Sequence, residues 1–403
     1  MFSNVTGNEN TALGAQALNK NIGGDGNTSV GRLSMYENTT GAGNVALGFE
    51  ALKANTTASS NTALGYRAMH ENTTGSYNLA AGVLALRYNQ DGVGNVAVGP
   101  VALETNVSGD KNTAVGVQAL WKSTGDGNTA VGHEAAYRTS TGSNSTALGR
   151  DALHENTTGS ENAAVGYEAM RSATTATGNS GVGHRALFAN LTGGYNTAVG
   201  RNAGSNFTAG NANTYIGNFS QASGGGTYDW SMALGESATV NATDIIRIGT
   251  NFTTSIGGYQ LWSNVSDGRY KRDVQENVHG LDLIMKLRPV TYKLDHAALI
   301  HDMYDDPEFA AERMAQIPER ARNTSESGFI AQEVDAAARE LGYEFSGVDA
   351  PKNSNDRYGL RYAAFVVPLV KAVQEQQAMI SNLESTVLEL QHQLRALSGS
   401  TDH

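Results

Sequence analysis

The sequence has no cysteine, few aromatic residues and no long apolar segment. The absence of Cys from its 403 residues excludes disulfides and thiolate sites and leaves the redox compartment open. Aromatic residues make up 7% and hydrophobic residues 39%, so the apolar material is thinly spread. No apolar run approaches the roughly 18 residues of a spanning helix, and the chain starts with neither the basic nor the apolar region of a secretion signal. We therefore expect no membrane insertion.

Positive charge is also scarce, because the formal net charge is -11 at pH 7. Proteins that bind nucleic acid gather Lys and Arg on one face, so DNA and RNA are not expected partners. The sequence shows no phosphate loop, no zinc-ligand spacing and no carboxylate pair. We expect no cofactor and no metal.

What the chain does contain is a repeat. A short Asn-x-Ala-Val/Leu-Gly phrase recurs thirteen times, with 17 residues between its terminal glycines except for one interval of 16. So regular a period predicts a solenoid in which each coil packs on the next. The terminal glycines are Gly14, Gly31, Gly48, Gly65, Gly82, Gly99, Gly116, Gly132, Gly149, Gly166, Gly183, Gly200 and Gly217.

Each position of the repeat has a predicted role. Ala two residues before the glycine and Val, Leu or Ile one before it predict a short strand. Ala and Leu three and four residues after it, as in Ala17-Leu18, predict one helical turn or a tight corner. A second glycine, seven residues before the first in most coils (Gly24, Gly41), predicts a turn with positive φ.

An Asn four residues before most of the glycines, from Asn10 to Asn213, predicts a ladder along the stack. Stacked amides satisfy one another's hydrogen bonds, and we favour an inward structural ladder. The alternative is a polar array that binds a glycan or a flat lattice. A Thr follows this Asn in several coils, and a regular row of Thr would suggest an ice-binding surface. Val45, Leu79 and Ala163 interrupt the row.

The coils hold only two or three apolar side chains each beyond alanine, so we expect them to bury surface against identical copies. The phrase Asn-Thr-Ala-Leu-Gly-x-x-Ala-Leu resembles the β-roll heads of trimeric bacterial adhesins and the repeat shafts of phage-type fibres. This resemblance covers about residues 8–220 and implies a fibrous, trimeric β-solenoid.

From Ser266 the composition becomes that of an ordinary α+β domain with three motifs. They read SDGRYKRDV (Ser266–Val274), LRPVTY (Leu287–Tyr292) and GFIAQEV (Gly328–Val334), and a long helix follows. Together they resemble the S74 peptidase family, the intramolecular chaperones found at the ends of phage tailspikes and fibres. The resemblance implies that the domain trimerises, templates folding of the fibre before it and then cuts the bond between Val265 and Ser266.

Ser266 and Lys271 are the candidate catalytic pair. A serine hydroxyl needs a base, and a lysine serves as that base only if burial or a neighbouring cation depresses its pKa from about 10.4. Arg269 and Arg272 flank Lys271, and Asp267-Gly268 must turn the chain to join the pair. Whether Lys271 serves its own serine or a neighbour's stays open. The plain alternative is a Ser-Asp turn with solvated basic residues.

Two further segments carry expectations. The segment from His296 to Ser327 is long and acidic. One interpretation is a metal site formed by Asp302, Asp305, Asp306 and Glu308 with His296 and His301. We favour the other, a solvated helical insertion over Pro307–Arg322. The terminal helix shows a coiled-coil seam with one polar position, Gln376. Its Val or Ile at a and Leu at d favour two strands, whereas the resemblance favours three. The seam residues are Val366, Leu369, Val373, Ile380, Leu383, Val387, Leu390, Leu394 and Leu397.

We predict a mainly β chain in four parts: a solenoid (1–217), a junction with terminal strands (218–265), an S74-like chaperone (266–362) and a coiled-coil helix with tail (363–403). The predicted protein is a homotrimeric, tail-fibre-like adhesion protein of a phage virion or related extracellular injection system, with an unknown cell-surface receptor such as a glycan. As an enzyme it would be a single-turnover autoproteolytic serine peptidase. The alternatives are a bacterial cell-surface adhesin with an uncleaved trimerisation cap and a glycan-cleaving tailspike.

Overall fold

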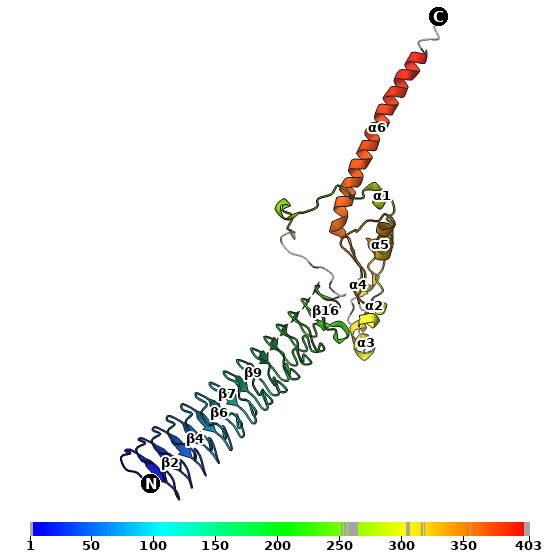
Figure 1. The fold of residues 1–403 in the computed structure, drawn as a ribbon. Coiled ribbons are helices and arrows are strands. Elements are labelled where there is room, and N and C mark those ends of the chain that lie inside the picture. The colour runs from blue at the N-terminus through cyan, green and yellow to red at the C-terminus, as the bar shows by residue number, and fades with distance from the viewer. Residues whose placement is uncertain are drawn as a thin grey trace. The chain divides into compact units, whose positions relative to one another are not determined.

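The computed structural model describes residues 3–250, 253, 256, 265–303, 307–315, 317, 319–354 and 356–398. The chain forms two compact units, Met1–Thr253 and Thr254–His403. The first is a β-solenoid and the second combines short helices and strands with one long helix (Figure 1). The predicted fold class is therefore confirmed for a single chain.

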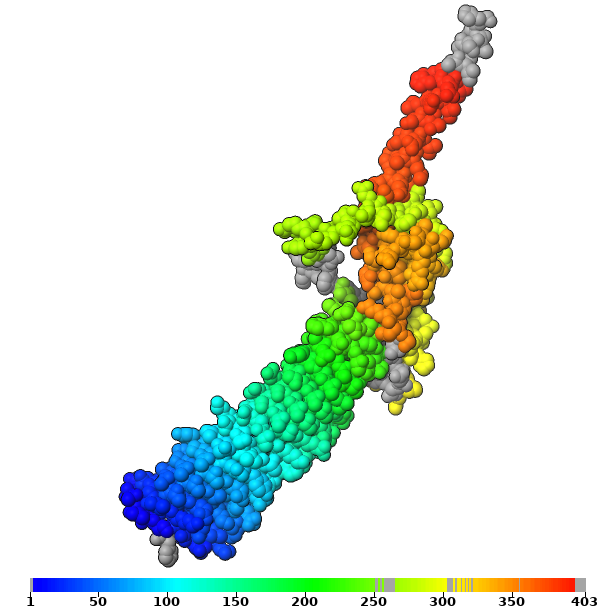
Figure 2. All heavy atoms as spheres, in the orientation of Figure 1, coloured from blue at the N-terminus to red at the C-terminus, as the bar shows by residue number. Residues whose placement is uncertain are grey.

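The solenoid has about 14 turns at 17-residue spacing, and its strands form one fifteen-stranded parallel sheet. Residues 17 apart pair directly, as Thr11 does with Thr28. The coils stack into a continuous body without breaks (Figure 2). The strands are Thr11–Leu13 (β1), Thr28–Val30 (β2), Val45–Leu47 (β3), Thr62–Leu64 (β4), Leu79–Ala81 (β5), Val96–Val98 (β6), Thr113–Val115 (β7), Thr129–Val131 (β8), Thr146–Leu148 (β9), Ala163–Val165 (β10), Ser180–Val182 (β11), Thr197–Val199 (β12), Thr214–Ile216 (β13), Met232–Leu234 (β15) and Ile246–Ile248 (β17).

The core of each coil is small. The middle residue of every strand from β2 to β13 is buried, usually Ala, while the first and third face outward. The Ala-Leu pair after the glycine is buried too, as at Ala51 and Leu52. This pair forms the tight corner and not the helical turn. Glu50 and Leu52 both take left-handed φ values, +55° and +51°, which send their N–H groups to opposite neighbours: Glu50 to Arg32 O and Leu52 to Ala68 O.

The two glycine positions serve different purposes. The terminal glycine has positive φ, as at Gly48 (+144°), and an added Cβ there would lie 2.3 Å from the carbonyl oxygen of Gly65. The prediction that the glycine seven residues earlier needs positive φ is wrong: Gly41 lies outside that region. Its reason is close approach, because a Cβ on Gly41 would lie 2.2 Å from the Ala58 oxygen.

The predicted Asn ladder is confirmed as a buried, structural one. Within it, Asn44 donates its backbone N–H to Asn27 Oδ1 at 3.0 Å and its Nδ2 to Ala58 O at 2.9 Å. Each ladder amide therefore satisfies backbone groups of the neighbouring coils. Burial leaves these amides without the surface that a glycan-binding array requires.

A second Asn ladder went unpredicted, although its members recur every 17 residues. In it Asn38 Nδ2 donates to Asn21 Oδ1 at 2.8 Å and to Gly41 O at 3.0 Å. The same Gly41 oxygen accepts from Asn27 of the first ladder, so the two ladders meet at one carbonyl per coil. The unbroken run of this second ladder is Asn4, Asn21, Asn38, Asn55, Asn72, Asn89 and Asn106, and Asn156 and Asn190 occupy the same position farther along.

The sheet continues past Gly217, where the sequence period lapses, through β15 and β17. Near this end the core changes its composition. Tyr215 replaces the strand alanine, and Gly204 replaces the corner leucine, where a Cβ would lie 2.8 Å from the Tyr215 ring. A two-stranded parallel sheet of Gln221–Ala222 (β14) and Thr239–Val240 (β16) and the short helix Ser223–Gly225 (η1) complete this unit.

The second unit has a small aromatic core that includes Leu283, Val334, Phe345 and Phe365. Helix α5 (Ala331–Glu340) is followed by a left-handed Gly342 (φ +64°), and the Tyr343 N–H donates to Ala338 O at 2.9 Å. The elements are Gly268–Tyr270 (η2), Leu281–Ile284 (α1), Val290–Tyr292 (β18), His296–Met303 (α2), Pro307–Ala315 (α3), Glu319–Asn323 (α4), Glu326–Gly328 (β19), Ala331–Glu340 (α5), Val348–Asp349 (β20), Gly359–Leu360 (β21), Tyr362–Phe365 (η3) and Val366–Ser398 (α6). Strands β18 and β19 pair antiparallel, as do β20 and β21.

The acidic segment contains the expected helices, α3 and α4. Asp302 pairs with Arg357 at 2.6 Å, while Asp305 and Asp306 lie outside the described residues. Among the helices within the described ranges, none combines the length and the apolarity needed to cross a bilayer.

Candidate active site

The turn that opens the second unit brings Ser266 and Lys271 together. Asp267 caps the short helix η2 by accepting the Arg269 N–H at 2.9 Å. The chain then folds back, with Lys271 N–H on Gly268 O at 3.2 Å. As a result Lys271 Nζ donates to Ser266 Oγ at 2.9 Å. The predicted turn at Asp267-Gly268 thus produces a side-chain contact across five residues.

The flanking arginine is turned toward Asp267. Arg269 forms a two-pronged ion pair with that carboxylate, Nη2 to Oδ2 at 2.5 Å and Nε to Oδ2 at 2.9 Å. This side-chain hydrogen bond, with help from the Arg269 backbone N–H, holds the pKa of Asp267 below its usual value. Asp267 therefore stays a carboxylate at neutral pH and keeps the turn capped.

Exposure is the main property of this site. Residues 265–277 are exposed almost throughout, and Val265 on the acyl side of the predicted scissile bond is 89% exposed. A nucleophile and a base in hydrogen-bond contact are half of a serine peptidase site. The other half, a dry environment and donors for the developing oxyanion, has to come from groups that cover this turn.

The other two motifs meet in the folded domain. LRPVTY supplies Arg288 and strand β18, and GFIAQEV runs from the end of β19 into α5, which carries Glu333. Arg288 Nε lies 3.1 Å from Glu333 Oε2, and this bond holds the pKa of Glu333 below its usual value. Residues 45 positions apart are thus tied together beside the β18–β19 pair.

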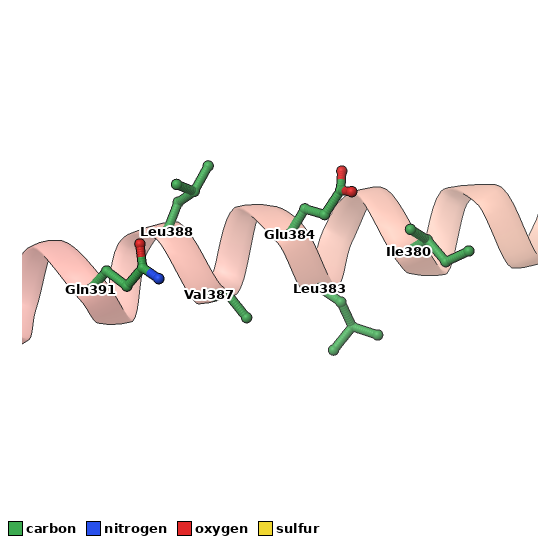
Figure 3. Close-up of a pocket in the computed structure, with 6 residues that line it drawn as sticks. All are labelled: Ile380, Leu383, Glu384, Val387, Leu388 and Gln391. Carbon is green, nitrogen blue, oxygen red and sulfur yellow. The ribbon is translucent and has the colours of Figure 1, made fainter.

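Helix α6 leaves its predicted seam uncovered. Glu375 near its start caps α1 by accepting the Leu281 N–H at 2.7 Å. Beyond it every described side chain from Gln376 to Arg395 is exposed. Leu383 and Val387 project to one side of the helix, and Glu384 and Leu388 project to the other (Figure 3). Leu397 lies in the last turn, where side chains fall outside the described set.

Two histidines at the corners of the solenoid are largely shielded from solvent. The side chains of His70 and His154 are 14% and 11% exposed. His154 stacks on Tyr137 with ring centroids 5.0 Å apart. Nearby, His133, Glu134 and Asp151 place ligand atoms within 4.8 Å of one another. Each carboxylate already has a partner, Arg150 for Asp151 and His154 for Glu134, and we assign no ion there.

Comparison with known proteins agrees with the motifs. Residues 266–343 match the family model Peptidase_S74, described as the chaperone of endosialidase. No curated protein matches the chain. The matched segment begins at Ser266 and contains Lys271, Arg288 and Glu333. After its β-solenoid the chain therefore contains a segment, residues 266–343, that is similar to the endosialidase-chaperone family, Peptidase_S74.

Proposed function

We propose that this chain is a homotrimeric, tail-fibre-like structural and adhesion protein whose C-terminal domain drives trimerisation and folding. The observation that carries the proposal is the uncovered seam of α6 directly downstream of a chaperone-family domain. Its place would be a virion tail fibre or a related extracellular fibre, with its receptor on a cell surface.

The seam explains why the copies must meet. Helix α6 has 33 residues, and its second half has nothing of its own chain to pack on among the described residues. An isolated helix of this kind is marginal in water, because packing supplies most helical stability. Leu383 is 63% exposed and Leu394 66%, and fully burying such a side chain is worth about 1.5–3 kcal/mol. Three helices joined along the seam would bury it.

The choice of three helices over two in the coiled coil depends on the similarity to the chaperone family. Ile380 and Val387 at a positions with Leu383 and Leu390 at d positions favour a two-stranded coil mildly. The chaperone family and the fibre-like repeat both favour three, and we adopt three. An α6 variant tests this step: Leu383→Asp places a charge in the seam and is expected to dissociate the copies. Ser385→Asp, on the outer face of the same turn, is expected to leave them together.

We propose further that the domain cuts the chain between Val265 and Ser266. Neutral Lys271 Nζ removes the Ser266 Oγ proton while Oγ attacks the Val265 carbonyl carbon. The C–N bond then breaks, the proton passes to the Ser266 nitrogen, and an ester joins Val265 to Ser266 Oγ. Water hydrolyses that ester, which restores the hydroxyl and leaves a Val265 carboxylate. The 2.9 Å contact between Nζ and Oγ supports these roles.

Assembly is the natural trigger for that chemistry. A lysine accepts a proton only after losing its own, and burial favours the neutral amine. In one chain the turn at 265–277 is exposed, so neighbouring copies would have to cover it. Cleavage is then expected only after the copies have met, which delays release until the fibre is in register.

The test is denaturing electrophoresis with N-terminal sequencing of the purified chain and its variants. We expect a fragment beginning at Ser266 that is absent from Ser266→Ala and from Lys271→Ala. Lys293→Ala removes an exposed lysine of the same unit outside this turn and is the matched control, with cleavage retained. An intact wild-type chain would contradict cleavage and favour the adhesin with a permanent cap. A fragment in Ser266→Ala would contradict the assigned nucleophile.

A further inference from the structure

One side of the solenoid carries no charge. The strand face consists of the first and third residues of each strand in the fifteen-stranded sheet, whose side chains point away from the coil. These thirty positions hold Thr, Val, Leu, Ile, Ala, Ser and Met, and not one acidic or basic residue. The apolar members are open to solvent in one chain: Leu47 is 51% exposed and Leu148 45%.

Charge gathers instead on the corner side, the segment from one to six residues after each terminal glycine. There the charges pair from coil to coil, as Arg67 does with Glu50 at 2.6 Å and Arg138 with Glu155 at 2.9 Å. Aromatic rings stack along the same side, Trp121 on Tyr137 with centroids 4.9 Å apart. These groups find their partners within the chain.

We propose that the strand face is the surface through which the solenoids of the copies contact one another, with the corner side turned outward. The inference rests on the proposed trimer and adds the surface that builds it along the shaft. The partner is a second and a third copy of this chain, aligned so that like coils lie at the same height.

The size of the strand face fits such a contact. Fifteen strands about 4.8 Å apart extend for about 70 Å, and two outward residues per strand make a strip about 10 Å wide. The strip offers about 700 Å² per copy, close to the ~800 Å² that each partner contributes to a standard stable interface.

The distribution of charge favours the strand face over the corner side as the contact surface between copies. The chain carries a net charge of -11, so identical charged surfaces placed against each other would repel or would need their ion pairs broken. The strand face has no such cost. Its β-branched and leucine side chains suit face-to-face packing of sheets, which lie about 10 Å apart.

The cysteine-free chain allows a direct test by thiol accessibility. Leu148→Cys places one thiol on the strand face, and Arg138→Cys places one on the corner side of the preceding turn. The original side chains are similarly exposed in one chain, 45% and 55%, so single chains would react alike. Losing the exposed Arg138 ion pair costs little. Each variant also carries Ser266→Ala, so that the chain stays at full length. Its mass is measured, and its rate of reaction with a maleimide is recorded.

We expect both variants to have the mass of three copies and the thiol at position 148 to react roughly tenfold or more slowly, because reactivity follows exposure. Three copies with equal rates, or with slower reaction at 138, would overturn the strand-face interface and leave the trimer intact. The mass of one chain would refute the trimer itself. If Leu148→Cys fails to fold, Val199→Cys on strand β12 repeats the test.

Discussion

The first Asn ladder allows a quantitative test at Asn95, whose side chain is fully buried. Its Nδ2 donates to Gly109 O at 2.8 Å, and its Oδ1 accepts the Asn112 N–H at 2.9 Å. Asn95→Ala removes both bonds. Gly109 O keeps a second donor, Asn106, but the Asn112 N–H is left buried and unpaired. A buried donor without a partner costs about 1–3 kcal/mol and a lost hydrogen bond about 1 kcal/mol. We therefore expect the free energy of unfolding to fall by about 2–4 kcal/mol.

The chain supplies its own control for this variant. In the ninth coil Ser145 occupies the ladder position, and its Oγ accepts the Asn162 N–H at 3.2 Å. Asn95→Ser should therefore keep Asn112 paired and lose only the bond to Gly109, about 1 kcal/mol. Urea unfolding followed by circular dichroism, at unchanged slope, measures both losses. Hydrogen exchange at the Asn112 amide reports local opening. An alanine variant within 0.5 kcal/mol of wild type, or a serine variant equally damaged, would refute the ladder's role.

Three further predictions concern other parts of the chain. Gly82→Ala should destabilise the solenoid by at least about 2 kcal/mol in urea unfolding, because φ is +148° and the new Cβ would lie 2.4 Å from a neighbouring oxygen. Gly75→Ala should cost less, since alanine already fills that coil position at Ala58. Burial raises the pKa of Glu50, but hydrogen bonds from the adjacent arginine and lysine outweigh it and leave the pKa lowered. Glu50→Gln should thus cost about 1–3 kcal/mol at pH 7, and the difference should vanish as the pH falls through the lowered pKa; a pH-independent loss in thermal melts would contradict this. Asp267→Ala should slow cleavage about fivefold on electrophoresis time courses, because a lost cap is worth about 1 kcal/mol, while Asp267→Asn keeps the acceptor and most of the rate. Equal rates in these two variants would count against the cap.

Much of the fold could be predicted because a repeat multiplies each local signal. The first Asn ladder was visible in the sequence since it stands beside the invariant glycine. The second was overlooked because Ser123, Thr139 and Ala173 interrupt it. The spacing of the glycines could not predict their φ values, because a positive φ and the close approach of a neighbouring backbone both require glycine. Only the structure of the stacked coils distinguishes Gly48 from Gly41.

The candidate active site also combines features that the sequence predicts with features that it does not. The contact between Ser266 and Lys271 follows from local turn chemistry, which a sequence records. The exposure of that turn depends on what surrounds it, and no local pattern encodes this. The low exposure of the His70 and His154 side chains likewise depends on residues supplied by the adjacent coils. The catalytic roles, the domain boundaries and the receptor remain predictions.

Self-association underlies every step of this account, from the seam of α6 to the strand face. The most direct test is sedimentation velocity of the Ser266→Ala chain, which keeps the C-terminal domain attached whether or not the wild type is cut. The account predicts a folded particle of three times the 42.4 kDa chain mass. A well-folded particle with the mass of one chain would contradict it.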